Sequence, residues 1–463
     1  MQSSPPSAND APLRAIEELE ELFRHAEKPR DKFRIGAEAE KFGLDAVSLR
    51  PVPYTGTSSI LGVFERFARY YGWAPVSEAP GSPIIALERG PTSITLEPGA
   101  QLELSGAPWP DVHGIRAEFV DHFQELGAIS RELGLCWLSV GFHPTASFEE
   151  LPWVPKERYP IMQQYLPTQG RRGRDMMQRT ATVQANFDFS SEEDAMRKLR
   201  VSLGLSPVFQ AMFANAPFRE GRVSELKSER LDVWLNMDPS RSGLIPSLWS
   251  VKKPRYRDYI EWALDAGMFF IKRGSHLVLN TGQTFRDFMQ RGFDGQQATQ
   301  GDWFRHLATL FPDVRLKSTL EVRTCDAVPE DLTLAIPALF AGILYDDRAL
   351  SDAEEVSRGV TLEAALASRA EVPRWGLGAQ LAGKPLRAMA ERLLDIARAG
   401  LARRARLNAK GEDEGVYLRP LARLVEAGRC PADELRQGQK PGDLMDGRAL
   451  GRVQVAKGRL GSA

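Results

Sequence analysis

The feature that most constrains this chain is a pair of glutamates inside a stretch that otherwise alternates like a β-strand. In residues 33–42 (FRIGAEAEKF), Glu38 and Glu40 share one strand face, and alanines take the opposite face. Glutamate is a poor strand former, and two like charges on one face raise the free energy unless a cation lies between them. This strand therefore either meets water along its polar face or holds a cation there.

Three further alternating stretches combine an apolar face with a face of acidic, amide and basic side chains. Two interpretations remain open. The strands either form a curved sheet whose concave face binds Mg²⁺ through carboxylates and anions through arginine, or they expose ordinary polar faces to solvent. The polar faces hold Glu97, Gln101 and Glu103 in residues 92–104, Thr182, Gln184, Asn186 and Asp188 in residues 180–189, and Arg315, Lys317, Thr319, Glu321 and Arg323 in residues 314–324.

The charge balance and the cysteine content exclude several classes of protein. Lysine plus arginine is 60 and aspartate plus glutamate is 61, so the chain lacks the basic excess typical of nucleic-acid or membrane-surface binding. Three widely spaced cysteines form no disulfide framework and no CxxC zinc motif. We find no apolar run of about 18 residues and no signal peptide. We expect a cytoplasmic protein with no nucleic-acid or membrane partner, either a monomer or a homodimer.

The order of the segments predicts the fold class. Residues 1–12 are polar and proline-rich, and we expect them to be disordered. Residues 13–463 are expected to form one domain whose part from about residue 330 is mainly helical. Helical periodicity also covers residues 111–134 and 191–213. Because the strands are not followed regularly by crossover helices, the pattern predicts an α+β fold with a mainly antiparallel sheet surrounded by helices.

Six segments resemble the plant and proteobacterial type of glutamate–cysteine ligase, and their order is that of the family. The resemblance runs from about residue 30 to about residue 435. It implies a curved, funnel-shaped antiparallel sheet like the catalytic part of glutamine synthetase. It also implies that ATP phosphorylates the γ-carboxylate of glutamate and that the amine of cysteine then displaces phosphate. The segments are GAEAEKFGL (36–44), ITLEPGAQLELSGAP (94–108), ERYPIMQQYLP (157–167), DMMQRTATVQANFDFSSE (175–192), FANAPFREG (213–221) and TGQTFRDFM (281–289).

The resemblance implies a role for particular residues. Mg²⁺ and ATP are the implied cofactor and co-substrate, with glutamate and cysteine as the other substrates. The catalytic residues would be Glu38, Glu321 and Arg323. The implied metal ligands are Glu38, Glu40, Glu97, Glu103 and Glu321. The implied substrate-binding residues are Arg158, Thr180, Thr182, Gln184, Arg230 and Trp234. The implied ATP-binding residues are Arg179, Arg323 and Asn186.

Two departures from the family keep alternatives open. Phe269 stands where the family pattern has tyrosine, and residues 320–329 (LEVRTCDAVP) look more like the branch that serves ergothioneine synthesis. A carboxylate–amine ligase with another acceptor amine is therefore one alternative, and a ligase of the ergothioneine pathway is another. A guanidino kinase, whose catalytic sheet is related, is an alternative of a different class.

Overall fold

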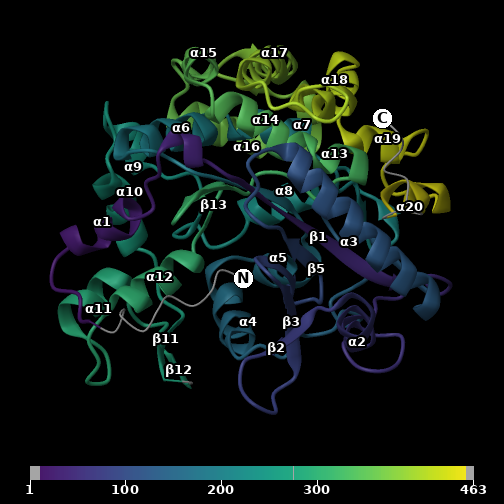
Figure 1. Ribbon diagram of the computed structural model, residues 1–463, viewed down its shortest axis with the longest axis horizontal. Helices are drawn as coiled ribbons and strands as arrows, with labels where there is room; N and C mark the ends of the chain where they lie inside the picture. Colours follow the sequence, from purple (N-terminus) through teal and green to yellow (C-terminus); the bar gives the residue numbers. More distant parts are fainter. Residues whose placement is uncertain (1–10, 275, 455–463) are drawn as a thin grey trace.

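A large antiparallel sheet forms the centre of the molecule (Figure 1). The computed structural model describes residues 11–274 and 276–454. The strand order is β14-β15-β7-β1-β5-β4-β3-β2, and β6 pairs with the far end of β1. Every pairing in this sheet is antiparallel, so the predicted α+β fold with a mainly antiparallel sheet is confirmed. Its strands are β1 (Ile35–Asp45), β2 (Ala74–Ser77), β3 (Ile84–Arg89), β4 (Thr92–Leu96), β5 (Leu102–Ser105), β6 (Leu135–Leu138), β7 (Val183–Phe187), β14 (Val314–Leu316) and β15 (Leu320–Val322).

Helices cover the sheet, and most of those from residue 330 onward gather above it in Figure 1. Helix α14 is buried along its whole length and packs on β7, and α17 packs over α14. The helices before residue 330 are α1 (Glu17–Arg24), α2 (Ile60–Tyr71), α3 (Val112–Leu133), α4 (Arg158–Gln169), α5 (Gly173–Arg179), α6 (Glu192–Gly204), α7 (Ser206–Met212), α8 (Glu229–Leu235), α9 (Ser247–Ser250), α10 (Tyr256–Leu264), α11 (Phe285–Arg291) and α12 (Gln300–Ala308). The later helices are α13 (Glu330–Thr333), α14 (Ala335–Leu344), α15 (Asp347–Ser357), α16 (Leu362–Trp375), α17 (Leu386–Arg404), α18 (Arg419–Glu426), α19 (Pro431–Arg436) and α20 (Gly447–Val453).

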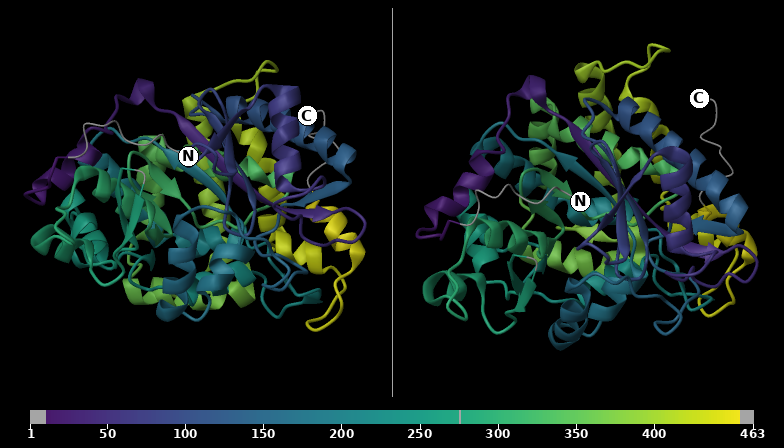
Figure 2. Two further views of the ribbon diagram at one scale, coloured as in Figure 1. Left: turned by 90° about the horizontal axis from the view of Figure 1, so that it is seen from below. Right: turned by 60° about the horizontal axis from the view of Figure 1, so that its bottom comes forward.

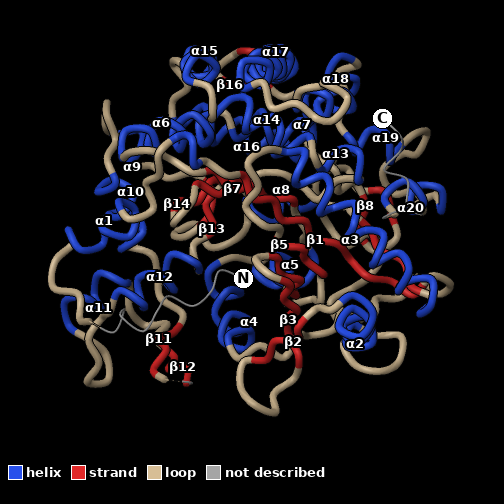
Figure 3. Tube along the Cα trace, viewed as in Figure 1, coloured by secondary structure: helices blue, strands red, loops and turns tan. Residues whose placement is uncertain are grey.

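Within the described residues, four two-stranded ribbons lie outside the central sheet. Figure 3 colours strands red and helps to locate them. In both views of Figure 2, the central strands lie between α1 on the left and yellow C-terminal helices on the right. The predicted disordered segment 1–12 falls outside the described residues as far as residue 10. The ribbon strands are β8 (Phe218–Arg219) with β9 (Arg222–Val223), β10 (Ser242–Gly243) with β13 (Phe311–Pro312), β11 (Phe270–Arg273) with β12 (His276–Leu279), and β16 (Gln380–Leu381) with β17 (Lys384–Pro385).

The stretch 314–324 is a tight hairpin, so its prediction as one alternating strand is wrong. Strands β14 and β15 pair antiparallel, which places Arg315 directly opposite Glu321. The turn closes with a hydrogen bond from the Lys317 N–H to the Thr319 carbonyl oxygen (3.0 Å). Valine and leucine pairs on the other face of both strands are fully buried, and this burial favours the hairpin over one long strand.

Two helices in the C-terminal half approach so closely that neither tolerates a side chain at the contact. A Cβ added to Gly400 of α17 would lie 1.9 Å from the Gly342 carbonyl oxygen of α14. A Cβ added to Gly342 would lie 2.4 Å from the Ala397 carbonyl oxygen. Glycine at both positions therefore permits the close packing that holds α14 against the sheet.

Gly400→Ala is expected to destabilise the protein. Alanine in a helix interior gains about 1 kcal/mol over glycine, but overpacking against a rigid backbone carbonyl costs about 1–3 kcal/mol. The measurement is the free energy of unfolding in urea. Gly204→Ala in α6 is the matched control, because the nearest atom to its new Cβ is 3.8 Å away. A Gly400→Ala protein as stable as the control would contradict the close contact.

Candidate active site

A cavity of about 300 Å³ lies against the polar face of the sheet. Helices α4, α5, α8 and α12 and the loops beside them close the other sides. The structure therefore brings together side chains that are up to 285 positions apart in the sequence, from Glu38 to Arg323 (323 − 38). The predicted site residues that line it are Glu38, Glu40, Glu97, Glu103, Arg158, Thr180, Thr182, Gln184, Arg230, Trp234, Glu321 and Arg323.

One wall of the cavity is acidic. Backbone pairing places Glu40 of β1 directly opposite Glu103 of β5 and sets Glu38 opposite Gln184 of β7. Glu38 accepts a hydrogen bond from Asn186 Nδ2 (2.9 Å). Removal from bulk water, with the charge of Glu103 as the next cause, raises the pKa of Glu38 to about 8. The wall therefore carries more negative charge than its surroundings neutralise.

The burial of Glu40 and the neighbouring Glu103 charge likewise raise its pKa well above the ordinary range. Its oxygens accept hydrogen bonds from the Thr182 N–H (3.0 Å) and from Gln184 Nε2 (3.5 Å). These donors orient the carboxylate without neutralising it. A bound cation would relieve the repulsion that remains.

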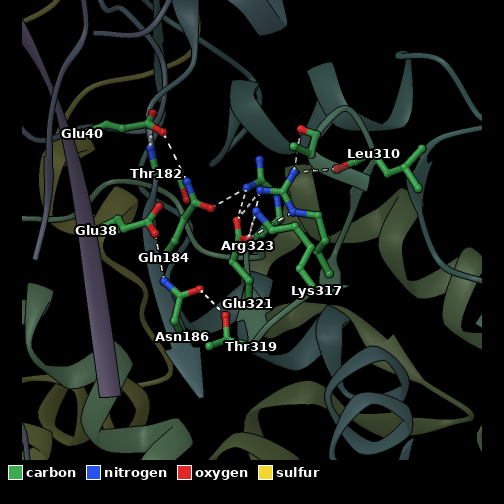
Figure 4. Close-up of polar contacts among 12 residues, drawn as sticks. Glu38, Glu40, Thr182, Gln184, Asn186, Leu310, Lys317, Thr319, Glu321 and Arg323 are labelled. Carbon is green, nitrogen blue, oxygen red and sulfur yellow. Dashed lines mark hydrogen bonds and ion pairs between the residues drawn. The ribbon is translucent and has the colours of Figure 1, made fainter. Parts of the chain in front are cut away.

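The facing wall is cationic and is organised around Glu321, as Figure 4 shows. Arg315 donates to both Glu321 oxygens, from Nη2 at 2.8 Å and from Nε at 3.0 Å. Arg323 also donates to Glu321, and the Lys317 ammonium lies 3.7 Å away. Burial would raise the pKa of Glu321, but Arg315, Lys317 and Arg323 lower it well below its usual range. One carboxylate therefore holds three cations at the edge of the cavity.

Asp326 and a backbone carbonyl hold Arg230, which the sequence predicted as a substrate-binding residue. Its guanidinium donates to the Arg323 carbonyl oxygen (3.0 Å) and lies 3.4 Å from the fully buried Asp326 carboxylate. A Cβ on Gly141 would meet Asp326 at 2.5 Å, so glycine there makes room for this carboxylate. Sequence reasoning missed the role of Asp326, because it lies after the alternating stretch and no periodicity marks it.

Two predicted ATP-binding residues do not line this cavity, although Asn186 donates to Glu38 at its edge. Arg179 packs over the Phe142 ring (4.6 Å) and donates to Glu220 (3.1 Å), so its guanidinium points to the other side of α5. Asn186 lines a second cavity of about 910 Å³. Glu38 lines both cavities and therefore lies at their junction.

The oxygen-rich acidic wall has the donor chemistry that Mg²⁺ prefers. In the part of the chain that the structure describes, no three histidine, cysteine, aspartate or glutamate side chains are grouped closely enough to enclose a metal ion. The donors fit Mg²⁺ in kind, and Mg²⁺ characteristically keeps water and substrate oxygens among its ligands. The cationic wall suits phosphate or carboxylate oxygens. Together the two walls define the class of enzyme that handles a polyphosphate and a carboxylate in one site.

Comparison with known proteins narrows this class to one family. The family model described as glutamate-cysteine ligase family 2 matches residues 34–455. The chloroplastic glutamate–cysteine ligase of Medicago truncatula is 40% identical over 412 residues, covering 88% of this chain and 78% of that ligase. The chloroplastic ligase of Arabidopsis thaliana is 39% identical and is covered to 76%. The chain belongs to the glutamate–cysteine ligase family, as its sequence motifs predicted.

A solved structure supports the fold. A glutamate–cysteine ligase from Francisella tularensis, crystallised in complex with AMP, superposes on this protein with a TM-score of 0.52 at 13% sequence identity. The superposition covers 88% of this chain and 85% of the Francisella chain. At this identity the likeness bears on the fold alone.

The expected compartment needs correction. The plant relatives are named chloroplastic, which contradicts the expectation of a cytoplasmic protein. The physical reason is that a cellular address is read by receptors from dedicated signals, so charge balance and the lack of apolar runs do not determine it. None of the helices that the structure describes has the length and apolar character needed to cross a bilayer.

His143, which is buried against the Phe42 ring, gives a test in acid. Burial, with the nearby charge of Arg179, lowers its pKa to about 3. Below about pH 6.5 the His143 imidazole is protonated in the unfolded chain but stays neutral in the folded protein. The free energy of unfolding therefore falls by up to about 1.4 kcal/mol for each pH unit. His143→Gln removes this loss, so the variant should gain stability relative to the parent as pH falls from 7 to 4. Urea unfolding across this range is the measurement, and a difference that is constant with pH would contradict the shift.

Proposed function

We propose that this protein joins the γ-carboxylate of glutamate to the amine of cysteine, using ATP and Mg²⁺, to give γ-glutamylcysteine, the precursor of glutathione. The observation that carries the proposal is a cavity in which a wall of carboxylates, with Glu40 and Glu103 buried, faces a wall of cations. The names of the plant relatives support the two amino-acid substrates. The chain's membership of this family argues against the guanidino-kinase alternative.

Glutamate binding is proposed for the part of the cavity lined by Arg158, Arg230 and Trp234. Planar guanidinium groups pair with carboxylates through two parallel hydrogen bonds. Buried Nε atoms of both arginines and Nε1 of Trp234 have no hydrogen-bond partner among the described residues, so all three are donors left for a ligand. The neighbouring side chains in this part of the cavity are Thr180, Thr182 and Gln184.

The acidic wall is the proposed metal site, with Glu38, Glu40, Glu97 and Glu103 as ligands. When bound, Mg²⁺ would neutralise the phosphate charge and hold the reacting groups in line. Glu321 is the fifth ligand that the family resemblance implies. It would have to release one of its three cations to bind metal, because Arg315 already contacts both of its oxygens.

Activation of glutamate would take place between the two walls. A γ-carboxylate oxygen of glutamate attacks the terminal phosphorus of ATP, and the bond to ADP breaks. Arg315, Lys317 and Arg323 face the developing negative charge and stabilise it. We place ATP across the second cavity, which Asn186, Glu38 and the cationic side chains of Lys28 and Arg34 line.

Coupling completes the reaction. The neutral amine of cysteine attacks the carbonyl carbon of γ-glutamyl phosphate, the carbon–nitrogen bond forms, inorganic phosphate leaves, and the nitrogen loses its extra proton to solvent. A phosphorylated carboxylate is a good electrophile, so this step needs no enzyme nucleophile. The three cysteines of the chain are buried, in agreement with a mechanism that does not use them.

The substrate assignment is tested by measuring ADP and inorganic phosphate with glutamate and a panel of amines. We expect phosphate release to require both glutamate and cysteine, and the product mass to equal their sum less one water. A kinase would release no inorganic phosphate. A faster rate with another amine would identify a different acceptor and refute cysteine as the substrate.

Glu38→Gln is expected to lower turnover about a hundredfold or more, since loss of a metal-site group has effects of this size or larger. Glu125→Gln is the matched control, because Glu125 pairs with Trp73 and Arg89 outside the cavity. The control should keep its turnover. Thermal unfolding of both variants separates a lost function from a lost fold, and retained turnover in a folded Glu38→Gln protein would refute the metal assignment.

A further inference from the structure

The cations that line the active-site cavity differ in whether a carboxylate neutralises them. Four form ion pairs within the protein: Arg315, Lys317 and Arg323 with Glu321, and Arg230 with Asp326. The other two, Lys156 and Arg158, also line the cavity, and neither forms an ion pair with a carboxylate in the described residues. A buried charge without a partner raises the free energy of the folded protein. An unpaired cation in a cavity therefore indicates an anionic ligand.

Lys156 is held in place by one backbone group. Its side chain is almost fully buried, at 3% exposure, and its ammonium donates to the Leu96 carbonyl oxygen at 2.6 Å. The same oxygen accepts from the Tyr159 hydroxyl at 2.9 Å. An ammonium has three N–H donors, so two remain after this bond. Leu96 directly precedes Glu97, so the ammonium is fixed at the acidic end of the cavity, near the start of α4 at Arg158.

The charges near Lys156 do not compensate it. Burial, followed by repulsion from the Arg158 guanidinium, lowers the pKa of Lys156 to about 8. Glu97 is the carboxylate with the largest effect on it, and Glu97 is itself proposed to hold Mg²⁺. Glu103, also a proposed metal ligand, and Glu78 have smaller effects on Lys156. With Glu97 and Glu103 committed to the metal, only Glu78 would remain to oppose Lys156 and Arg158, two cations that lie two positions apart where α4 begins.

We propose that Lys156 binds, together with Arg158, the α-carboxylate of an amino-acid substrate. This inference rests on the proposed function and extends it. Lys156 is not among the substrate-binding residues that the family resemblance implies, and the α-carboxylate is a group of the substrate that does not react. The phosphate-handling cations lie across the cavity around Glu321, which leaves a carboxylate as the anion for the Lys156 end. Both glutamate and cysteine carry such a group.

The test compares each substrate with its analogue that lacks the α-carboxylate. Cysteamine is cysteine without this group, and 4-aminobutyrate is glutamate without it. Lys156→Gln should raise the KM of the amino acid whose carboxylate it binds by about tenfold or more, and leave the kcat/KM of the matching analogue within about twofold. A change confined to the cysteine–cysteamine pair identifies cysteine as the ligand. A change confined to the other pair identifies glutamate.

Two further variants guard against a purely structural effect. Lys156→Arg keeps the cation and should restore most of the lost affinity. Lys41→Gln is the matched control, because Lys41 is also a buried lysine whose ammonium donates to one backbone carbonyl (3.2 Å), yet it does not line the cavity. The control should leave the ratio of amino acid to analogue unchanged.

The inference is overturned if Lys156→Gln lowers the activity of the amino acids and their analogues in equal proportion, or if it changes none of them. Either result would leave the proposed function standing, provided that the parent enzyme makes γ-glutamylcysteine. Failure of the parent enzyme to form this product would instead refute the proposed function. Isothermal titration of glutamate into the parent and the variant gives a readout that does not need turnover.

Discussion

The electrostatic repulsion between carboxylates on neighbouring strands is the constraint around which the site is built. The antiparallel pairing of β1 with β5 brings these carboxylates together. Glu40 and Glu103 lie directly opposite each other, and like charges in that position destabilise a sheet. Burial increases the cost, because water no longer screens the charges. The sheet accepts this arrangement because its other face is packed into the main core beneath helices such as α14, so apolar burial outweighs the repulsion. The strained wall is then ready to bind a divalent cation.

On the cationic wall the groups that repel one another are positively charged. Three cations crowd at one edge of the cavity, and Glu321 holds them together through contacts that include two direct bonds from Arg315. Because β14 and β15 form a hairpin, Arg315 and Glu321 face each other across one pair of strands instead of lying six residues apart on a single strand. The hairpin therefore concentrates positive charge in a small volume. Asp326 pairs with Arg230 in the same way that Glu321 pairs with its three cations. The acidic wall and the cationic wall therefore each keep their own sign of charge.

Much of this site follows from local rules. The two-residue period of a strand determines which side chains share a face, so the alternation in residues 33–42 predicted that Glu38 and Glu40 lie together, and they do. The hairpin could not be predicted, because both Arg315 and Glu321 stay on the polar face whether the chain turns or runs straight. Arg179 adjoins a strand of the site in sequence, but it ends α5 and points to the far side. Sequence adjacency gives no direction across a helix end, and only tertiary packing decides it.

Separation of the two walls also bears on how such an enzyme protects its intermediate. An acyl phosphate reacts with water as well as with an amine, so the site must exclude water while it neutralises charge. Here Glu40, Glu103 and Glu321 are buried, as are Arg315, Lys317 and Gln184. Hydrogen bonds fix the side chains of the site in place, such as that from Asn186 to the partly buried Glu38. Groups fixed in this way cost little reorganisation when charge develops, and they act more strongly away from water. The same burial that makes the polar face costly to fold is therefore what suits it to stabilise a reactive, charged intermediate.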